Sequence, residues 1–387
     1  MNMKYKLKDI FDLQMGKTPS RNNTEYWNTE EHKWISIADL TKTGKYISET
    51  KECLSNRAID DSGIKVIPAN TVVMSFKLSI GKTAITAEDM YSNEAIMAFH
   101  DKHVVKILPE YIYYMFKYKN WDEGSNKAVM GKTLNKATLS EVEIDICSLE
   151  EQREIVKVLD KMMSVLDGRE TELSLLDDLI KARFVEMFGD ESNPLGWDVV
   201  NVEDVATVQV GVVIKPAQYY TDAANGVRAF RSLNIGSMYI KDNDWVYFSE
   251  EGNSKNAKSI LKENDLIIVR SGAPGTACVV TKEYAGCNAI DIIIAHPDMN
   301  KVNPYYLCVY TNLPHGKRQI DEGTGGAAQQ HFNVGKYNKL QLMLPPIEKQ
   351  DEFVLFMEQV DKSKVVIQAA LDKSQLLFDS LMQKYFG

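Results

Sequence analysis

The feature that most constrains this sequence is an internal repeat. Residues 148–189 recur as residues 346–387 without insertion or deletion, so that Gln152 corresponds to Gln350 and Gly189 to Gly387. Each copy follows a run in which apolar residues alternate with other residues, a pattern typical of a strand. Because an internal repeat marks a duplicated structural unit, we expect two similar halves, each a globular head followed by a long helix.

The repeated segment is predicted to be helical over nearly its whole length. Between Ser148 and Phe188 it contains no proline and a single glycine, Gly168. Ser148 and Glu151 form a capping box at the start, and Gly189 provides a stop. At about 1.5 Å per residue, each copy would form a rod roughly 60 Å long.

Each predicted helix carries an apolar stripe whose residues are spaced by four and three positions. Such a heptad pattern predicts pairing with another helix, because a lone helix with an apolar stripe is not stable in water. Polar residues interrupt the stripe at Arg169 and Arg183 in the first copy and at Lys364 and Ser374 in the second. The predicted pairing residues are Ile155, Leu159, Met162, Leu166, Leu173, Leu176, Ile180 and Met187 in the first copy, and Phe353, Met357, Val360, Ile367, Leu371, Phe378, Leu381 and Tyr385 in the second.

Two arrangements would cover these stripes. In one, the helices are arms that pair with the helices of a second molecule. In the other, which we favour, the two copies within one chain lie antiparallel, because the repeat supplies two helices of equal length. Since each helix carries a head at its start, antiparallel pairing would place the heads at opposite ends of a rigid spacer.

The two heads also align with each other. Gln14-Met15-Gly16 matches Gln209-Val210-Gly211, and the strand-like residues 66–76 match residues 260–270. Pro109 and Pro304 each open a short predicted helix, and residues 124–139 match residues 323–340. The stretches between these matches differ strongly, as expected of one scaffold that carries two different binding surfaces.

Short alternating runs dominate both heads, so the predicted fold class is α+β. We expect two β-rich α/β domains, each followed by a long helix, with the helices pairing as an antiparallel coiled coil of pseudo-two-fold symmetry. The predicted boundaries are 1–147 for the first head, 148–189 for the first long helix, 190–198 for a linker, 199–345 for the second head and 346–387 for the second long helix.

The residues that catalysis by this chain would need are missing from the sequence. Three Gly-Lys-Thr triplets occur, beginning at Gly16, Gly81 and Gly131, but none has the earlier glycine of a phosphate-binding loop. Leu344-Pro345-Pro346-Ile347 lacks the Asp or Asn of an amino-methyltransferase tetrapeptide, and the few histidines are scattered. We therefore expect a non-catalytic protein that binds no metal.

Composition excludes some locations and permits a nucleic-acid partner. The five cysteines are scattered and read as reduced thiols, and neither a signal peptide nor a membrane span is recognisable, so a cytoplasmic protein is expected. The net charge of −9 at first argues against nucleic acid, yet most of the acidic excess falls on the two helices. A local positive patch on a head would suffice for phosphate binding.

The chain resembles the specificity subunits of type I restriction-modification systems. The junctions CSLEEQREIVKVLD and LPPIEKQDEFVLFM resemble the family's Leu-Pro-Pro and Glu-Gln signature, as do QMGKTPS near the start and GTGGAAQQHFN near the end. The first junction departs from the signature, with Cys147-Ser148 in place of two prolines. The resemblance covers nearly the whole chain.

This resemblance implies a division of labour. Each head would be a target-recognition domain that reads one half of a split, asymmetric site in double-stranded DNA. The helices would set the gap between the halves and dock methyltransferase subunits, two being expected, and a restriction subunit with motor and nuclease activity would join them. This chain would bind no cofactor, because S-adenosylmethionine, ATP and Mg²⁺ would belong to its partners.

Base readout uses Arg or Lys for guanine and Asn or Gln for adenine, while Lys, Ser and Thr commonly contact phosphate. Arg270 and the run from Gln329 to Asn333 are favoured because base-reading side chains cluster there beside permissive turns. Tyr111, Tyr113, Tyr114, Tyr305 and Tyr306 are interpreted as core residues. The DNA-contacting residues that we predict are Lys17, Thr18, Ser20, Arg21, Lys77, Ser79, Lys82, Lys127, Lys132 and Asn135 in the first head, and Lys215, Arg228, Arg231, Arg270, Ser271, Thr276, Gln329, Gln330, His331 and Asn333 in the second.

Two other functions fit the same pattern. A scaffold without DNA affinity could use the helices to join two protein-binding heads, and its partner capture would survive deletion of residues 329–333. A specificity subunit of a related system, whose partner fuses cleavage and methylation, would have the same sequence features.

Overall fold

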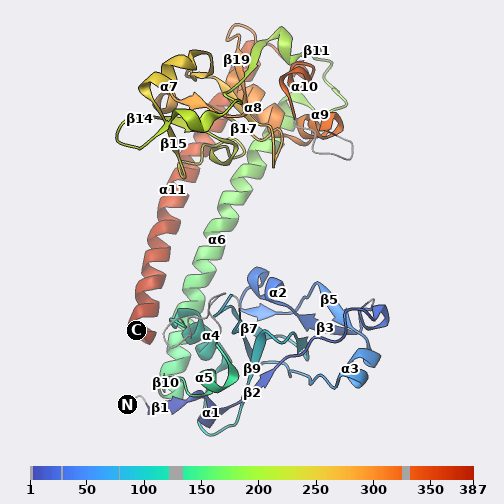
Figure 1. Cartoon of the computed structure of the whole chain (residues 1–387), viewed down its shortest axis with the longest axis vertical. Coiled ribbons are helices and arrows are strands. Elements are labelled where there is room, and N and C mark those ends of the chain that lie inside the picture. The colour runs from blue at the N-terminus through green and yellow to red at the C-terminus, as the bar shows by residue number, and fades with distance from the viewer. Residues whose placement is uncertain (1–2, 28, 78, 122–133, 325–331) are drawn as a thin grey trace. The chain divides into compact units, whose positions relative to one another are not determined.

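The computed structural model describes residues 3–27, 29–77, 79–121, 134–324 and 332–387. The chain divides into two compact units, of which the first comprises Met1–Glu170 with Ala369–Gly387 and the second comprises Thr171–Gln368. Each unit contains one head and a part of each long helix, α6 (Leu149–Phe188) and α11 (Ile347–Phe386), drawn in green and red in Figure 1. Among the described residues, no helix combines the length and apolar character needed to cross a bilayer.

The head of the first unit is built on a mixed five-stranded sheet of order β2-β9-β6-β7-β4. The head also contains a separate three-stranded sheet, of order β5-β3-β8. Strand β1, at the start of the chain, pairs with β10, the strand that leads into α6. The strands are β1 (Met3–Lys6), β2 (Phe11–Met15), β3 (His32–Ile35), β4 (Tyr46–Ile47), β5 (Glu52–Leu54), β6 (Val72–Ser75), β7 (Thr83–Thr86), β8 (Tyr91–Ser92), β9 (Ile96–Asp101) and β10 (Glu143–Ile146). The helices are α1 (Leu7–Ile10), α2 (Ile37–Lys42), α3 (Asn56–Ser62), α4 (Pro109–Tyr118) and α5 (Lys136–Ser140).

The head of the second unit repeats this plan. Its sheet β12-β19-β16-β17 corresponds strand for strand to β2-β9-β6-β7, and β11 pairs with β20 as β1 pairs with β10. The strands are β11 (Asp198–Asn201), β12 (Ala206–Val210), β13 (Tyr220–Thr221), β14 (Gly226–Phe230), β15 (Val246–Ser249), β16 (Leu266–Val269), β17 (Ala277–Val279), β18 (Asn288–Ala289), β19 (Ile292–Pro297) and β20 (Gln341–Leu344). The helices are α7 (Glu250–Lys255), α8 (Pro304–Asn312), α9 (Pro314–Thr324) and α10 (Val334–Asn338).

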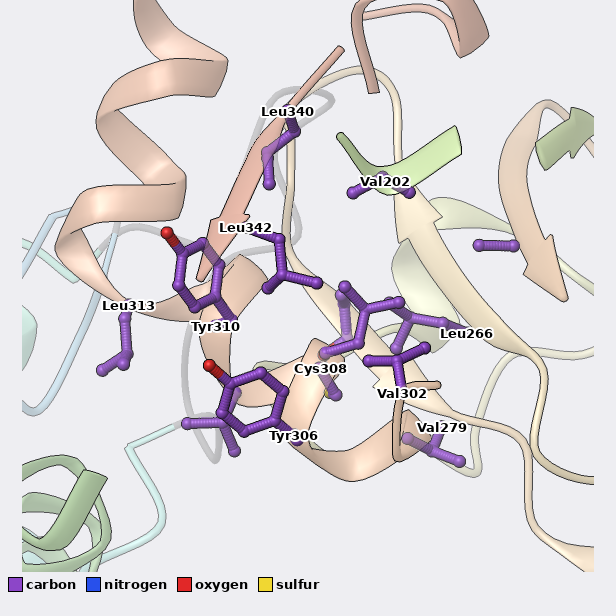
Figure 2. Close-up of a cluster of buried hydrophobic side chains, with 14 of the residues drawn as sticks. Val202, Leu266, Val279, Val302, Tyr306, Cys308, Tyr310, Leu313, Leu340 and Leu342 are labelled. Atoms are coloured by element: carbon purple, nitrogen blue, oxygen red, sulfur yellow. Dashed lines mark hydrogen bonds between the residues drawn. The ribbon is translucent and has the colours of Figure 1, made fainter. Parts of the chain in front are cut away.

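Alternation along the strands gives each main sheet two apolar faces. In β6, Val72 and Met74 face the cluster that contains α4, while Val73 faces a second cluster with Ile35 and Leu40. In the second head, α8 and β20 contribute to the larger cluster, and Figure 2 shows Tyr306, Tyr310 and Leu342 within it. The expectation of alternating runs is therefore wrong for β6 and β16, which are buried at every position because both faces of the sheet are covered.

The two long helices pack together as an antiparallel pair, which confirms the predicted fold class. In the first unit, Leu159 near the start of α6 shares a buried cluster with Met382 near the end of α11. In the second unit, Ile180 near the end of α6 shares a cluster with Phe353 and Met357 near the start of α11. None of the predicted stripe residues is exposed on either helix.

Local sequence explains where the long helices begin and end. Ser148 Oγ accepts a hydrogen bond from the Glu151 amide (3.3 Å), while the Glu151 carboxylate accepts one from the Ser148 amide (3.1 Å), so the predicted capping box forms. Gly189 ends α6 with a φ of 84°, a backbone conformation that favours glycine. The second copy starts after Pro345-Pro346, where the missing amide hydrogens cost the helix nothing.

Candidate nucleic-acid interface

The turn after the central strand of each head has the same backbone in both halves. In the first head, the Gly81 amide donates to the Ser75 carbonyl (2.9 Å) and the Ser75 amide to the Lys82 carbonyl (2.9 Å). In the second head, the Gly275 amide donates to the Val269 carbonyl (2.9 Å) and the Val269 amide to the Thr276 carbonyl (2.8 Å). Lys82 and Thr276 are therefore structurally equivalent.

A further backbone bond extends this equivalence. The Leu134 amide donates to the Phe76 carbonyl (3.2 Å), and the Phe332 amide donates to the Arg270 carbonyl (3.3 Å). The polar residue that follows, Asn135 or Asn333, caps a short helix by accepting from Thr138 (2.8 Å) or Lys336 (3.0 Å). The backbone framework and the capping asparagine are thus shared, while Phe76 of the first head is replaced by Arg270 in the second.

Several predicted residues of the first head gather around Glu94. The Thr18 hydroxyl donates to its carboxylate, and this bond, with the charges of Lys77 and Arg21, holds the pKa of Glu94 below its ordinary value. Thr18 follows β2, whereas Lys77 lies in the turn after β6, so the sheet brings together segments far apart in sequence. A carboxylate held ionised among these groups keeps their donors oriented.

Arg21 contacts two aromatic rings and one carboxylate. Its guanidinium lies 3.8 Å from the ring centroid of Trp27 and 4.9 Å from that of Trp34. Glu52 accepts from it through both carboxylate oxygens, at 2.5 and 3.1 Å. Stacking on the two rings holds the plane of the guanidinium, while Glu52 accepts from the pair of donors with which arginine recognises guanine or phosphate.

The remaining predicted residues of the first head are also located. Lys17 donates to the Ser62 carbonyl, and Lys82 donates to the Thr41 hydroxyl. Ser20 is exposed and its carbonyl accepts from the Trp27 indole (3.0 Å), while Ser79 accepts through its carbonyl from Ser75. Lys127 and Lys132 lie outside the described residues.

Arg270 anchors the turn region of the second head. Its side chain is only 15% exposed, pairs with Asp291 and donates through Nε to the Phe332 carbonyl (3.2 Å). Together with the backbone bond to Phe332, this ties the strand β16 to the segment that starts α10. Gln329, Gln330 and His331, which precede Phe332 in sequence, lie outside the described residues.

Arg228 lies on β14 of the second head, and Arg231 follows the end of that strand. Arg228 is 5.4 Å from the Trp245 ring centroid and 3.6 Å from the Asp242 carboxylate. Arg231 donates to the Asp244 carbonyl, and its buried Nε forms no hydrogen bond with the described part of the chain. Phe230, which precedes Arg231, accepts through its carbonyl from the Ile290 amide (2.8 Å), and the next residue, Asp291, is the partner of Arg270.

The other predicted residues of the second head are placed as follows. Lys215 is exposed after β12, with a φ of 43°, and Ser271 is half-buried in the turn after β16. Thr276 accepts a hydrogen bond through its hydroxyl from Lys317 Nζ (3.2 Å). Lys317, a half-buried cation of α9, carries no local signal of this contact, because 41 positions separate it from Thr276 in sequence.

The acidic partners of the predicted residues could not be identified from sequence. Glu52, Glu94, Asp242 and Asp291 are each separated from their partners by many positions in sequence. No local pattern relates them, because tertiary folding alone places them together. In contrast, the interpretation of the tyrosines as core is confirmed for Tyr111, Tyr113, Tyr114 and Tyr306, which are 2% exposed or less.

The histidine, cysteine and carboxylate side chains bear on whether the heads could hold a metal ion or a disulfide. Across the described ranges, no group of three or more His, Cys, Asp or Glu side chains is arranged to hold a metal ion. The cysteines of the described chain are free thiols, and burial raises the pKa of Cys287 to about 11. The heads do carry side-chain donors held by acceptors of the same chain, such as Arg21 and Arg270.

These features define a class of protein: a duplicated α+β chain with one head in each half and two paired helices. The chain belongs to the family described as the type I restriction modification DNA specificity domain, whose model matches residues 2–174 and 194–374. It is therefore a member of the specificity-subunit family, whose proteins are the non-catalytic components of type I restriction-modification enzymes.

Individual relatives and solved structures agree with this membership. The chain is 23% identical over 364 residues to the type I restriction enzyme MjaIX specificity subunit of Methanocaldococcus jannaschii, covering 88% of this chain and 82% of the relative. It is 22% identical over 381 residues to the EcoprrI specificity subunit of Escherichia coli, covering 92% and 86%.

Two solved structures share the fold. One is a structure of the type I restriction-modification system, with a TM-score of 0.61, 16% identity and coverage of 100% of this chain and 97% of that chain. The other is the S subunit from M. genitalium, with a TM-score of 0.54, 13% identity and coverage of 100% and 96%.

Proposed function

We propose that this chain reads a split, asymmetric site in double-stranded DNA, with one half-site bound by each head. The two long helices set the gap between the half-sites and dock methyltransferase subunits, two being expected. A restriction subunit completes the assembly. S-adenosylmethionine, ATP and Mg²⁺ are bound by these partners and not by this chain.

The observation that carries the proposal is the equivalent turn in the two heads. Lys77 and Lys82 of the first head are replaced by Ser271 and Thr276 of the second, on one backbone pattern. A duplicated scaffold with different donors is what the reading of two unlike sequences requires. Two copies of one reader would instead suit a symmetric site.

Exposed apolar side chains on the helices support the docking of partners. None of them is a predicted stripe residue: Leu175, Leu179 and Val185 on α6, and Leu355, Val365, Val366, Leu376 and Leu377 on α11. Leu179 and Leu377 are equivalent in the internal repeat. Exposed apolar residues at such positions favour a protein partner.

A binding titration tests the proposal. The chain is combined with a cognate methyltransferase subunit, and binding to labelled duplexes is followed by fluorescence anisotropy across a series of salt concentrations. We expect sequence-specific binding that weakens as salt rises, because phosphate contacts release counterions. Binding that ignores sequence, or partner capture without DNA binding, would instead favour a scaffold.

Arg21 provides a residue-level prediction. Arg21→Ala should weaken binding of the assembled complex to its cognate duplex about tenfold or more, because a bidentate arginine contact is lost. Glu52→Gln should leave the affinity equal or raise it, since it removes a carboxylate that competes with DNA for the same guanidinium.

Arg57 supplies a matched control for Arg21. It lies on α3, is 64% exposed and pairs with Glu25, so Arg57→Ala should bind as the unmodified protein does. Anisotropy titrations at one salt concentration compare the three variants. Equal DNA affinities for Arg21→Ala and Arg57→Ala would show that Arg21 does not contact the DNA.

A further inference from the structure

Each long helix begins with a glutamine whose side chain is fully buried. Gln152 of α6 and Gln350 of α11 are both 0% exposed. They occupy equivalent positions in the internal repeat, one turn after the start of each helix. Glutamine is mostly an exposed residue, and burying its amide is costly unless the amide is hydrogen-bonded.

The amide of Gln152 is fully engaged with backbone groups. Its Nε2 donates to the Lys106 carbonyl (3.0 Å) and to the Cys147 carbonyl (3.0 Å). Its Oε1 accepts from the Leu108 amide (2.9 Å). One side chain therefore ties the start of α6 to the segment that leads into α4 and to the end of β10.

Gln350 makes the same three bonds in the second unit. Its Nε2 donates to the Lys301 carbonyl (3.1 Å) and to the Pro345 carbonyl (2.8 Å). Its Oε1 accepts from the Asn303 amide (2.8 Å). The segment bound is again the one that leads into the short helix of the head, here α8.

All six partners of these glutamines are backbone groups. At two of the three partner positions the side chains differ between the halves, with Leu108 matching Asn303 and Cys147 matching Pro345, while the third position is lysine in both. The hydrogen-bond pattern nevertheless stays the same, so it does not depend on the divergent side chains of the heads. An apolar side chain could fill the same space, but it would not impose the directional restraint that three hydrogen bonds supply.

We propose that Gln152 and Gln350 are positioning residues, which fix the direction in which each long helix leaves its head. This inference rests on the proposed function, in which the helices set the gap between two half-sites. A tilt of about 5° at the base of a rod roughly 60 Å long moves its far end by about 5 Å, which exceeds the rise of about 3.4 Å per base pair. A loose junction would therefore let the protein accept a gap one base pair too long or too short.

The test replaces the amides without changing side-chain length. Gln152→Met, Gln350→Met and the double variant are assembled with the methyltransferase subunits. Each complex is titrated with duplexes that carry the mapped half-sites at the cognate gap and at gaps one base pair longer and shorter. We expect the ratio of cognate to altered-gap affinity to fall about tenfold, while the cognate affinity falls less.

Two controls separate positioning from stability. Gln359→Met, at an exposed position of α11, should leave the ratio unchanged. Val73→Ala destabilises the first head in a cluster that contains no residue of α6 or α11, and it should weaken binding without changing the ratio. If the glutamine variants also lose affinity for all three gaps in equal proportion, the proposal is overturned.

A milder variant serves if the methionine variants do not fold. Gln350→Asn keeps a neutral amide at the site, but its side chain is one methylene shorter, so the three hydrogen bonds cannot all form. The same relaxation of gap preference is expected, and an unchanged preference overturns the proposal. Absence of any gap preference in the unmodified complex would contradict the proposed function itself, so the two failures are distinguishable.

Discussion

Phe184→Ala is expected to lower the free energy of unfolding of the second unit by about 3–5 kcal/mol. Phe184 is 1% exposed and lies at the meeting point of α6, α8 and α11. Its ring centroid is 4.9 Å from that of Phe188, 5.2 Å from that of Tyr306 and 5.3 Å from that of Phe353. Truncation would leave a cavity among rigid aromatic rings that cannot collapse to fill it.

Chemical denaturation, followed by circular dichroism and tryptophan fluorescence, measures this effect. Leu175→Ala is the matched control, because Leu175 lies on the same helix and is 61% exposed. Its effect should stay within about 0.5 kcal/mol. A loss below about 1 kcal/mol for Phe184→Ala would show that α6 is not held against the second head as described.

Lengthening the gap between the half-sites by half a helical turn is expected to abolish specific binding. An insertion of roughly five base pairs turns the second half-site to the opposite face of the duplex, where the second head cannot reach it. The affinity should fall at least about 100-fold, toward the level of non-specific binding. The reason is that paired helices resist the bending and twisting that would be needed to follow the displaced half-site.

Competition binding with the assembled complex measures the change. Inserting the same base pairs outside the site is the control, since it alters the length and charge of the duplex but not the gap. That control should compete as the original duplex does. If the duplex with the lengthened gap binds within about tenfold of the original duplex, the spacer is not rigid.

The helices could be predicted from sequence because their determinants are local. A capping box, a terminating glycine and a heptad stripe all act within a few turns, and the repeat supplies each signal twice. Phe184, Phe188 and Met382 were nevertheless missed as buried residues. The heptad pattern marks only the seam between the helices, whereas these three side chains pack against the heads on a neighbouring face.

The candidate interface could be predicted only in part. Residue type and permissive turns indicated Arg21 and Arg270, but not that Glu52 and Asp291 would pair with them. Likewise, the order of strands in each sheet depends on pairings between distant segments, which no local pattern encodes. Gln152 and Gln350 stood out as a repeated motif, yet their role became visible only with the backbone groups around them.

The equivalence of the two halves also separates scaffold from specificity. Gly16 and Gly211 occupy the same place after the first long strand, where a Cβ would approach the Asn93 or the Ala289 carbonyl oxygen to within 2.4 Å. Such shared positions maintain the backbone. The residues that follow them have diverged: Lys17 is exposed in the first head, whereas Val212 packs in a buried cluster of the second with Phe248 and Ile290.

Mapping methylated bases across the genome of cells that express this chain with its methyltransferase subunit tests the central claim most directly. The account predicts methylation at a single motif, made of two short, unlike sequences separated by a constant number of unspecified base pairs. Removal of this chain should abolish that methylation. A continuous or palindromic motif, a variable gap, or methylation that persists without this chain would contradict the account.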